Sequence, residues 1–151
     1  MKKTQHFLII LVFIVIGCKS SRQSKSEMYP IITFEKTTCF GTCPAYQFKA
    51  FPDGSVTYTG EKNVDLMGEY KSKLSEEELA NLKSLFDEGG FFKYANVYSA
   101  NIEDQPTTYL YYDNGQQNAK ITDYFGAPES LKKLEKDIEA MINAIQWQKS
   151  N

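Results

Sequence analysis

The chain has 151 residues, of which 42% are hydrophobic and 24% are charged, and its formal net charge is −2. This length suits one globular domain that can bury a real core. The slight excess of acidic side chains argues against nucleic-acid binding, because nucleic acid requires a clustered positive face.

The first eighteen residues have the pattern of a bacterial lipoprotein signal. Lys2 and Lys3 precede an apolar run over residues 7–16, and the run ends just before Cys18. A basic start, about 7–15 apolar residues and a small residue at the cut define a secretory signal. The run is shorter than the roughly 20 apolar residues that span a bilayer. We therefore predict that residues 1–17 are a lipoprotein signal peptide; an ordinary signal peptide or a short uncleaved anchor are the alternatives.

A polar, serine-rich segment follows, so residues 18–28 are predicted to be a lipidated cysteine and a flexible tether. A tether of this length keeps its domain within roughly 20 Å of the bilayer. In the lipoproteins that this pattern resembles, an aspartate directly after the lipidated cysteine can retain the protein at the inner membrane, but here the residue is Lys19. The prediction is a domain held by the lipid on Cys18 in the bacterial cell envelope, at the outer membrane and facing the periplasm.

Cleavage of the signal would also remove His6, the only histidine, together with Lys2 and Lys3. The formal charge would then change from −2 to −4. Without an imidazole, the mature chain lacks Ser-His-Asp and Cys-His nucleophilic machinery and histidine general-base chemistry. We therefore expect a protein that is not an enzyme and that uses no cofactor.

Cys39 and Cys43 remain as an even pair once Cys18 carries lipid. In an oxidising compartment this pair is expected to form a disulfide. So small a ring stabilises by only about 2 kcal/mol, so its main effect would be to fix a sharp loop. A redox-active pair usually has two intervening residues rather than three. A zinc site would need two further ligands, so no metal site is predicted.

The first half of the domain is predicted to form strands and then a helix. The strands are residues 31–35, 46–51, 56–60 and 68–73. The middle two flank a turn at residues 52–55, where proline and glycine suit the turn geometry. Ser75 and Glu78 form a capping box that begins a helix. That helix is expected to end at Gly89.

The second half repeats this order, with a hairpin followed by a helix. Strands at residues 107–112 and 116–122 flank Asn114 and Gly115, a strong hairpin signal. The last helix carries its apolar residues on one stripe: Leu131, Leu134, Ile138, Met141, Ile142 and Ile145. We predict one α+β domain over residues 29–148, with an antiparallel sheet of about five to six strands and two helices packed on one face.

The octet Cys39-Phe40-Gly41-Thr42-Cys43-Pro44-Ala45-Tyr46 carries a family resemblance. Together with Asp53-Gly54, Tyr58-Thr59-Gly60, Phe91-Phe92 and Asp104, it resembles a bacterial family known as domain of unknown function 6438. The resemblance spans roughly residues 31–147. It implies a small domain often found on exported or lipid-anchored bacterial proteins, and it implies no catalytic residues.

Four residues form the candidate binding surface: Tyr109, Tyr111, Phe40 and Asp104. Strand alternation places both tyrosines on one face, opposite Leu110. Exposed tyrosines suit sugars or peptides because they combine a large area with a polar tip. Packing of tyrosines at the wet edges of a small sheet is the plainer explanation for them.

The function that follows is a lipid-anchored envelope protein whose domain is a non-catalytic binding or structural module for a protein or glycan partner. The alternative is an envelope enzyme or inhibitor module that uses loop carboxylates or the Cys39/Cys43 pair. Such an enzyme would need two carboxyl groups close together in space, and sequence alone does not show which ones are close. The candidates are Asp53, Asp65, Glu69, Glu103, Asp104 and Asp123.

Overall fold

The structure is a computed structural model that describes residues 28–150. The predicted signal peptide, Cys18 and the predicted tether before Met28 lie outside the described residues.

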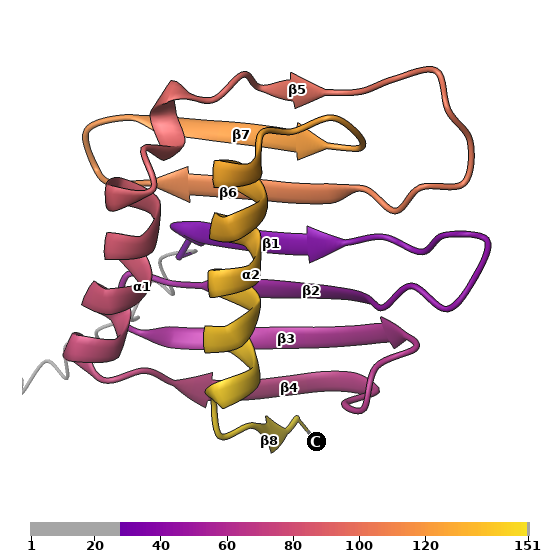
Figure 1. Ribbon diagram of the computed structural model, residues 1–151. Coiled ribbons are helices and arrows are strands. Elements are labelled where there is room, and N and C mark those ends of the chain that lie inside the picture. The colour runs from indigo at the N-terminus through magenta and orange to yellow at the C-terminus, as the bar shows by residue number, and fades with distance from the viewer. Residues whose placement is uncertain (1–27, 151) are drawn as a thin grey trace, which may run out of the picture.

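The described chain forms one open sheet of eight strands, and two helices cross the same face of it (Figure 1). The strand order is β5-β7-β6-β1-β2-β3-β4-β8, and all pairs are antiparallel except β5 with β7. This confirms the α+β class. The elements are β1 (Ile32–Lys36), β2 (Ala45–Ala50), β3 (Ser55–Lys62), β4 (Gly68–Lys73), α1 (Glu76–Glu88), the 3-10 helix η1 (Phe91–Lys93), β5 (Val97–Tyr98), β6 (Thr108–Asp113), β7 (Asn118–Asp123), α2 (Glu129–Ala144) and β8 (Gln148–Lys149).

The sheet has more strands than the five to six predicted. The additional strands, β5 and β8, are two residues long and lie at the two edges of the sheet. Two residues cannot show the alternation that marks a strand in sequence. β5 forms because Thr122 N–H donates to Asn96 O and Tyr124 N–H donates to Tyr98 O. β8 forms by antiparallel pairing with β4. Both are therefore consequences of tertiary pairing.

Local signals at the turns and helix ends agree with the structure, with one difference in length. Ser75 Oγ accepts from Glu78 N–H at 3.2 Å, and the Glu78 carboxylate accepts from Ser75 N–H at 2.7 Å, which completes the predicted capping box. The predicted hairpin around Gly115 is present, but residues 114–117 form a four-residue connection. Asn114 Oδ1 accepts from two of the amides in that connection and so stabilises the longer turn.

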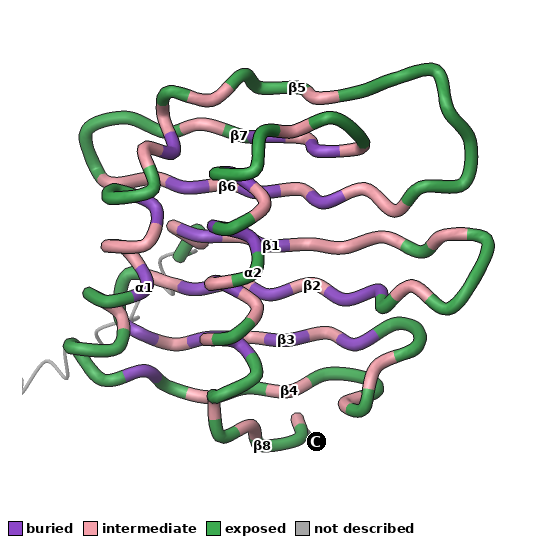
Figure 2. Tube along the Cα trace, in the orientation of Figure 1, coloured by how far each residue is buried: buried purple, intermediate pink, exposed green. Residues whose placement is uncertain are grey.

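Alternation along the central strands separates a buried face from an uncovered one. Phe34 lies between Phe48 and Leu110 in the register, and all three are fully buried under the helices. Figure 2 shows this as buried segments that recur along the central strands. Four apolar positions of the predicted α2 stripe are buried, while Met141 and Ile145 are partly buried. The other face of the sheet is half-exposed and polar.

The two ends of the sheet differ in what they carry. The chain enters β1 at one end, the entry end, which also holds the turns at residues 51–54 and 114–117. The opposite end, the loop end, holds the connections at residues 37–44, 63–67, 99–107 and 124–128. None of the helices within residues 28–150 is both long and apolar enough to cross a membrane.

Candidate functional site

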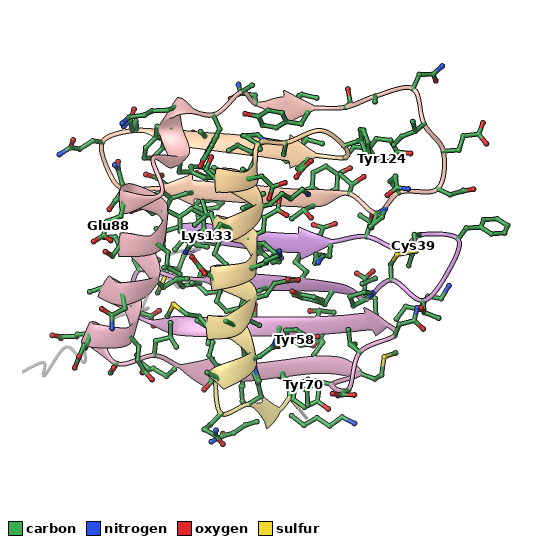
Figure 3. All side chains as sticks on the ribbon, in the orientation of Figure 1. Cys39, Tyr58, Tyr70, Glu88, Tyr124 and Lys133 are labelled. Carbon is green, nitrogen blue, oxygen red and sulfur yellow. A yellow bond between two sulfur atoms is a disulfide. The ribbon has the colours of Figure 1, made fainter. Side chains whose placement is uncertain are left out.

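The cysteine loop at residues 37–44 is closed by the predicted disulfide. Cys39 and Cys43 are bonded, with their Cα atoms 5.6 Å apart, and Cys39 is seen at the loop end in Figure 3. Phe40 lies within the small ring and is 92% exposed. The disulfide therefore holds a large apolar side chain in solvent.

Asp104 lies at the same end of the sheet, in the connection between β5 and β6. It is exposed and adopts a positive φ of 64°. Thr37 and Thr107 join this connection to the cysteine loop, because Thr37 N–H donates to Thr107 O at 3.0 Å and Thr107 N–H donates to Thr37 Oγ1 at 2.9 Å. Phe40 and Asp104 therefore share the loop end.

Tyr109 and Tyr111 lie elsewhere, on the uncovered face of the sheet. They pair with Glu35 and Thr33 of β1 and are half-buried. Lys120 places its ammonium group 4.9 Å from the centre of the Tyr109 ring. The four predicted surface residues thus come from two settings, two on the uncovered face of the sheet and two in connections at the loop end. The strand alternation is confirmed.

Each of the four connections at the loop end exposes one large apolar side chain. These are Phe40, Met67, Ile102 and Phe125, and we call them the apolar rim. Their exposed fractions are 92%, 49%, 36% and 49%. Sequence reasoning identified only Phe40. For Met67, Ile102 and Phe125, the sequence showed only an apolar residue inside a segment without helix or strand periodicity. That pattern does not reveal that four such segments meet at one end of the sheet.

A cleft of about 560 Å³ opens between the C-terminal half of α2, the β3–β4 connection and the sheet. Its aromatic residues are Tyr46, Tyr58 and Trp147. Its remaining lining is Pro44, Val64, Leu66 and Ile142, with the polar residues Asn63, Asp65, Glu139 and Asn143. This volume lies within the range of small-molecule and peptide side-chain sites.

The floor of the cleft is a pair of stacked tyrosine rings. The centres of Tyr46 and Tyr58 are 5.2 Å apart, and the Trp147 ring lies 5.5 Å from Tyr58. The Tyr46 hydroxyl donates to Glu139 Oε1 at 3.0 Å, and burial followed by Glu139 raises the pKa of Tyr46. Burial, with smaller effects of Asp65 and Tyr70, raises the pKa of Tyr58 to about 12. Both phenols therefore stay neutral at physiological pH.

The wall of the cleft depends on a close approach of two backbone segments. Gly60 of β3 lies so near the Leu66 carbonyl that a β-carbon at Gly60 would overlap it. Asn63, with φ of 54°, donates from Nδ2 to Cys43 O at 3.1 Å. The β3–β4 connection is therefore folded back on its strand and tied to the cysteine loop.

A buried charged cluster lies under the N-terminal half of α2. Asp123 at the end of β7 and Glu135 of α2 are 1% and 7% exposed. Lys132 Nζ lies 2.5 Å from Asp123 Oδ2 as an ion pair, and it donates to Glu135 Oε2 at 3.3 Å. Within the described residues, Asp123 Oδ1 and Glu135 Oε1 have no hydrogen-bond partner. One ammonium group thus serves two buried carboxyl groups.

The carboxylates considered from sequence have separate environments. Hydrogen bonds from Ser55 lower the pKa of Asp53 and make it a turn residue. Glu69 lies on the uncovered face. Glu103 is exposed beside Asp104. Of these carboxylates, Asp65 lines the cleft. Glu139 also lines it and was not identified from the sequence.

The described residues bring together no group of three or more histidine, cysteine, aspartate or glutamate side chains that could hold a metal ion.

Comparison with known proteins identifies one family. A family model described as a domain of unknown function, DUF6438, matches residues 30–142, most of the chain. No curated protein matches the chain.

Proposed function

We propose that this chain, which belongs to the DUF6438 family, is a lipid-anchored envelope protein whose domain binds a protein or glycan partner at its loop end without catalysing a reaction. The observation that carries the proposal is the apolar rim. Four connections that are distant in sequence each expose a large apolar side chain at one end of the sheet: Phe40, Met67, Ile102 and Phe125. Exposed apolar groups that gather on one surface are typical of interaction sites.

The position of the rim fits a tethered domain. The predicted tether joins β1 at the entry end, and the rim lies at the other end of the strands. Strands of six to eight residues at about 3.3 Å per residue separate the two ends by roughly 20–25 Å. A domain held at its entry end would present the rim away from its own lipid anchor.

The rim is also held in place by contacts between its connections. Asn63 of the β3–β4 connection bonds to Cys43 O, and Tyr124 donates to Ile102 O at 2.5 Å. Figure 3 shows Tyr124 beside the end of β7 that leads to this region. Preorganised connections lose little conformational entropy on binding. This supports recognition by a preformed surface.

The alternative, an enzyme or inhibitor module that uses loop carboxylates or the cysteine pair, has less support. Cys39 and Cys43 are bonded to each other in an exposed loop, and Glu103 and Asp104 are also exposed. General acid–base chemistry is favoured by carboxyl groups whose pKa is shifted inside a cleft. Among the carboxyl groups of the described residues, the one whose pKa is raised belongs to Glu135, which does not line the cleft.

Two experiments test the proposal. For the anchor, Cys18→Ser should move the protein from the membrane fraction to the soluble envelope fraction, and unchanged membrane association would refute lipid anchoring.

For the rim, a photo-crosslinking amino acid at Phe40 or Phe125 should give discrete adducts in cells. The same group at Gln116, which is exposed at the entry end, serves as the control. Adducts that form equally from Gln116, or no adducts from the rim across growth conditions, would contradict binding at the loop end.

A further inference from the structure

We propose that the cleft between α2 and the β3–β4 connection binds a lysine or arginine side chain from a basic peptide segment of the partner. This inference rests on the proposed binding function and names the chemistry of the partner. It is carried by the unpaired polar groups, the charge and the aromatic floor of the cleft.

The cleft contains hydrogen-bonding groups with capacity to spare. Tyr58 is only 6% exposed, yet its hydroxyl has no hydrogen-bond partner among the described residues. Glu139 receives two donors, Lys36 Nζ at 2.7 Å and the Tyr46 hydroxyl at 3.0 Å, and both bond to Oε1. Its second oxygen can therefore accept from a ligand. The Tyr58 hydroxyl is not among the buried polar atoms without a partner, so its oxygen reaches the open cleft, where a bound donor or acceptor can pair with it.

The charge of the residues that line the cleft favours a positively charged ligand. Asp65 and Glu139 line the cleft, and no lysine or arginine does. Lys36, the cation nearest to Glu139, approaches it from β1 and is not part of the lining. Glu139 is paired with Lys36, whereas Asp65 forms no ion pair within the described residues, so an anionic ligand would meet an uncompensated carboxylate at Asp65. An ammonium or guanidinium group supplies the donors and the positive charge that the cleft lacks.

The aromatic rings add a second preference for a cation. Tyr58 and Trp147 lie 5.5 Å apart, and Trp147 is half-buried, so part of its indole remains accessible. Figure 3 shows Tyr58 beside the C-terminal half of α2, next to Tyr70. Cations are attracted to aromatic faces, most strongly to tryptophan. Rings and carboxylates in one cleft therefore favour the same class of ligand.

The connection between cleft and rim favours a peptide over a free amine. The β3–β4 connection supplies Leu66 to the cleft and Met67 to the rim. The cysteine loop supplies Pro44 to the cleft and Phe40 to the rim. A partner resting its apolar residues on the rim could therefore insert a basic side chain into the cleft.

Trp147 makes this cleft directly observable, because it is the only tryptophan in the whole chain. The full chain in mild detergent is titrated with acetyl-Lys-Lys-Lys-amide while the tryptophan emission is recorded. The matched ligand control is the same peptide with all three side-chain amines acetylated. A saturable change with the charged peptide is expected, and the acetylated peptide should cause none. Added salt should weaken the binding, because it screens exposed charges.

Three variants locate the binding. Asp65→Asn and Tyr58→Phe should each weaken the binding of the charged peptide about three- to fivefold, as expected for loss of one partly exposed polar contact. Glu139→Gln should act in the same direction. Glu77→Gln also removes one negative charge, in the exposed first turn of α1 outside the cleft, and should leave the affinity within about twofold.

Several outcomes would overturn the inference. Equal responses to the charged and acetylated peptides would exclude charge recognition. A response to chitotriose but not to the charged peptide would assign the cleft to a glycan. Unchanged affinity in Asp65→Asn, or no response from a chain whose circular dichroism is native, would exclude a cation site. The crosslinking at Phe40 and Phe125 does not depend on a basic peptide. If those adducts persist while the peptide fails to bind, the cation site in the cleft is refuted and partner binding at the loop end is not.

Discussion

Lys132 places its ammonium group 2.5 Å from the carboxylate of Asp123, which joins the first turns of α2 to the end of β7. Asp123 is 1% exposed, so the Lys132 ammonium group is the main charge that offsets the cost of burying its carboxylate. A buried charge that loses its partner is strongly destabilising. The pair therefore fixes where α2 begins to cross the sheet.

Replacement of Lys132 by methionine should expose this dependence. Lys132→Met keeps much of the side-chain volume but leaves Asp123 and Glu135 without a cation. We expect the free energy of unfolding to fall by about 2–4 kcal/mol, measured by urea denaturation. Adding Asp123→Asn should recover a large part of that loss, because the buried charge is removed. A double variant no more stable than Lys132→Met would contradict the charge explanation.

The stability of the domain should fall as the pH rises. Burial raises the pKa of Glu135 to about 7 from its usual 4.5, with Lys132 opposing the rise and Asp123 reinforcing it. The folded chain then holds the proton more tightly than the unfolded chain, so stability decreases between these two values and levels off above the higher one. We expect a loss of roughly 1–2 kcal/mol between about pH 5 and pH 8, after allowing for solvent screening.

Glu135→Gln is the matched variant for that measurement. Its amide can donate to the unpartnered Asp123 oxygen without titrating. We expect this variant to show a flatter dependence of unfolding free energy on pH and higher stability than the parent at pH 8. An equally steep dependence in Glu135→Gln would assign the titration to another group.

Gly60→Ala should damage the wall of the cleft. A β-carbon at Gly60 would overlap the Leu66 carbonyl, which is backbone and cannot rotate away. We expect a loss of about 1–3 kcal/mol in unfolding free energy, together with a change in Trp147 emission. Gly41→Ala is the control, because the nearest atom to its added carbon would be Cys39 Sγ at 3.8 Å, an ordinary contact. Equal effects of the two substitutions would contradict the close-approach explanation.

Removal of the disulfide should affect the rim more than the fold. We expect the double variant Cys39→Ser, Cys43→Ser to lose only about 1–2 kcal/mol, because the ring is small. Crosslinking from Phe40 should weaken, since its loop becomes more mobile, while crosslinking from Phe125 should be retained. Intact mass after alkylation checks the starting state: exported protein should react at neither Cys39 nor Cys43 until it is reduced. Two free thiols in exported protein would refute the disulfide.

The order of the strands and helices was largely predictable from sequence. Ser75 and Glu78 mark the start of α1 because a capping box acts within one turn. The pair Cys39 and Cys43 was identifiable because only four positions separate them. Alternation also placed Leu110 and Tyr111 on opposite faces, since the period of a strand is a local property.

The cleft, the rim and the charged cluster could not be predicted in this way. Tyr46 and Glu139 are 93 positions apart, and Lys36 and Glu139 are 103 apart. Their proximity depends on which strands become neighbours and on where α2 crosses them. Asp123 appeared in the sequence as one scattered carboxylate, and only the sheet order placed it beside Lys132.

By itself, the sequence determined the class of the domain and its cysteine bridge, and it predicts a lipid anchor at Cys18, because each of these signals is encoded by spacing within a short segment. Only the tertiary structure decided that Phe40, Met67, Ile102 and Phe125 share one end of the sheet and that Asp65 and Glu139 face one cleft. The physical reason is that pairing of β1 with β6 and packing of α2 set these positions through contacts between segments far apart in the chain.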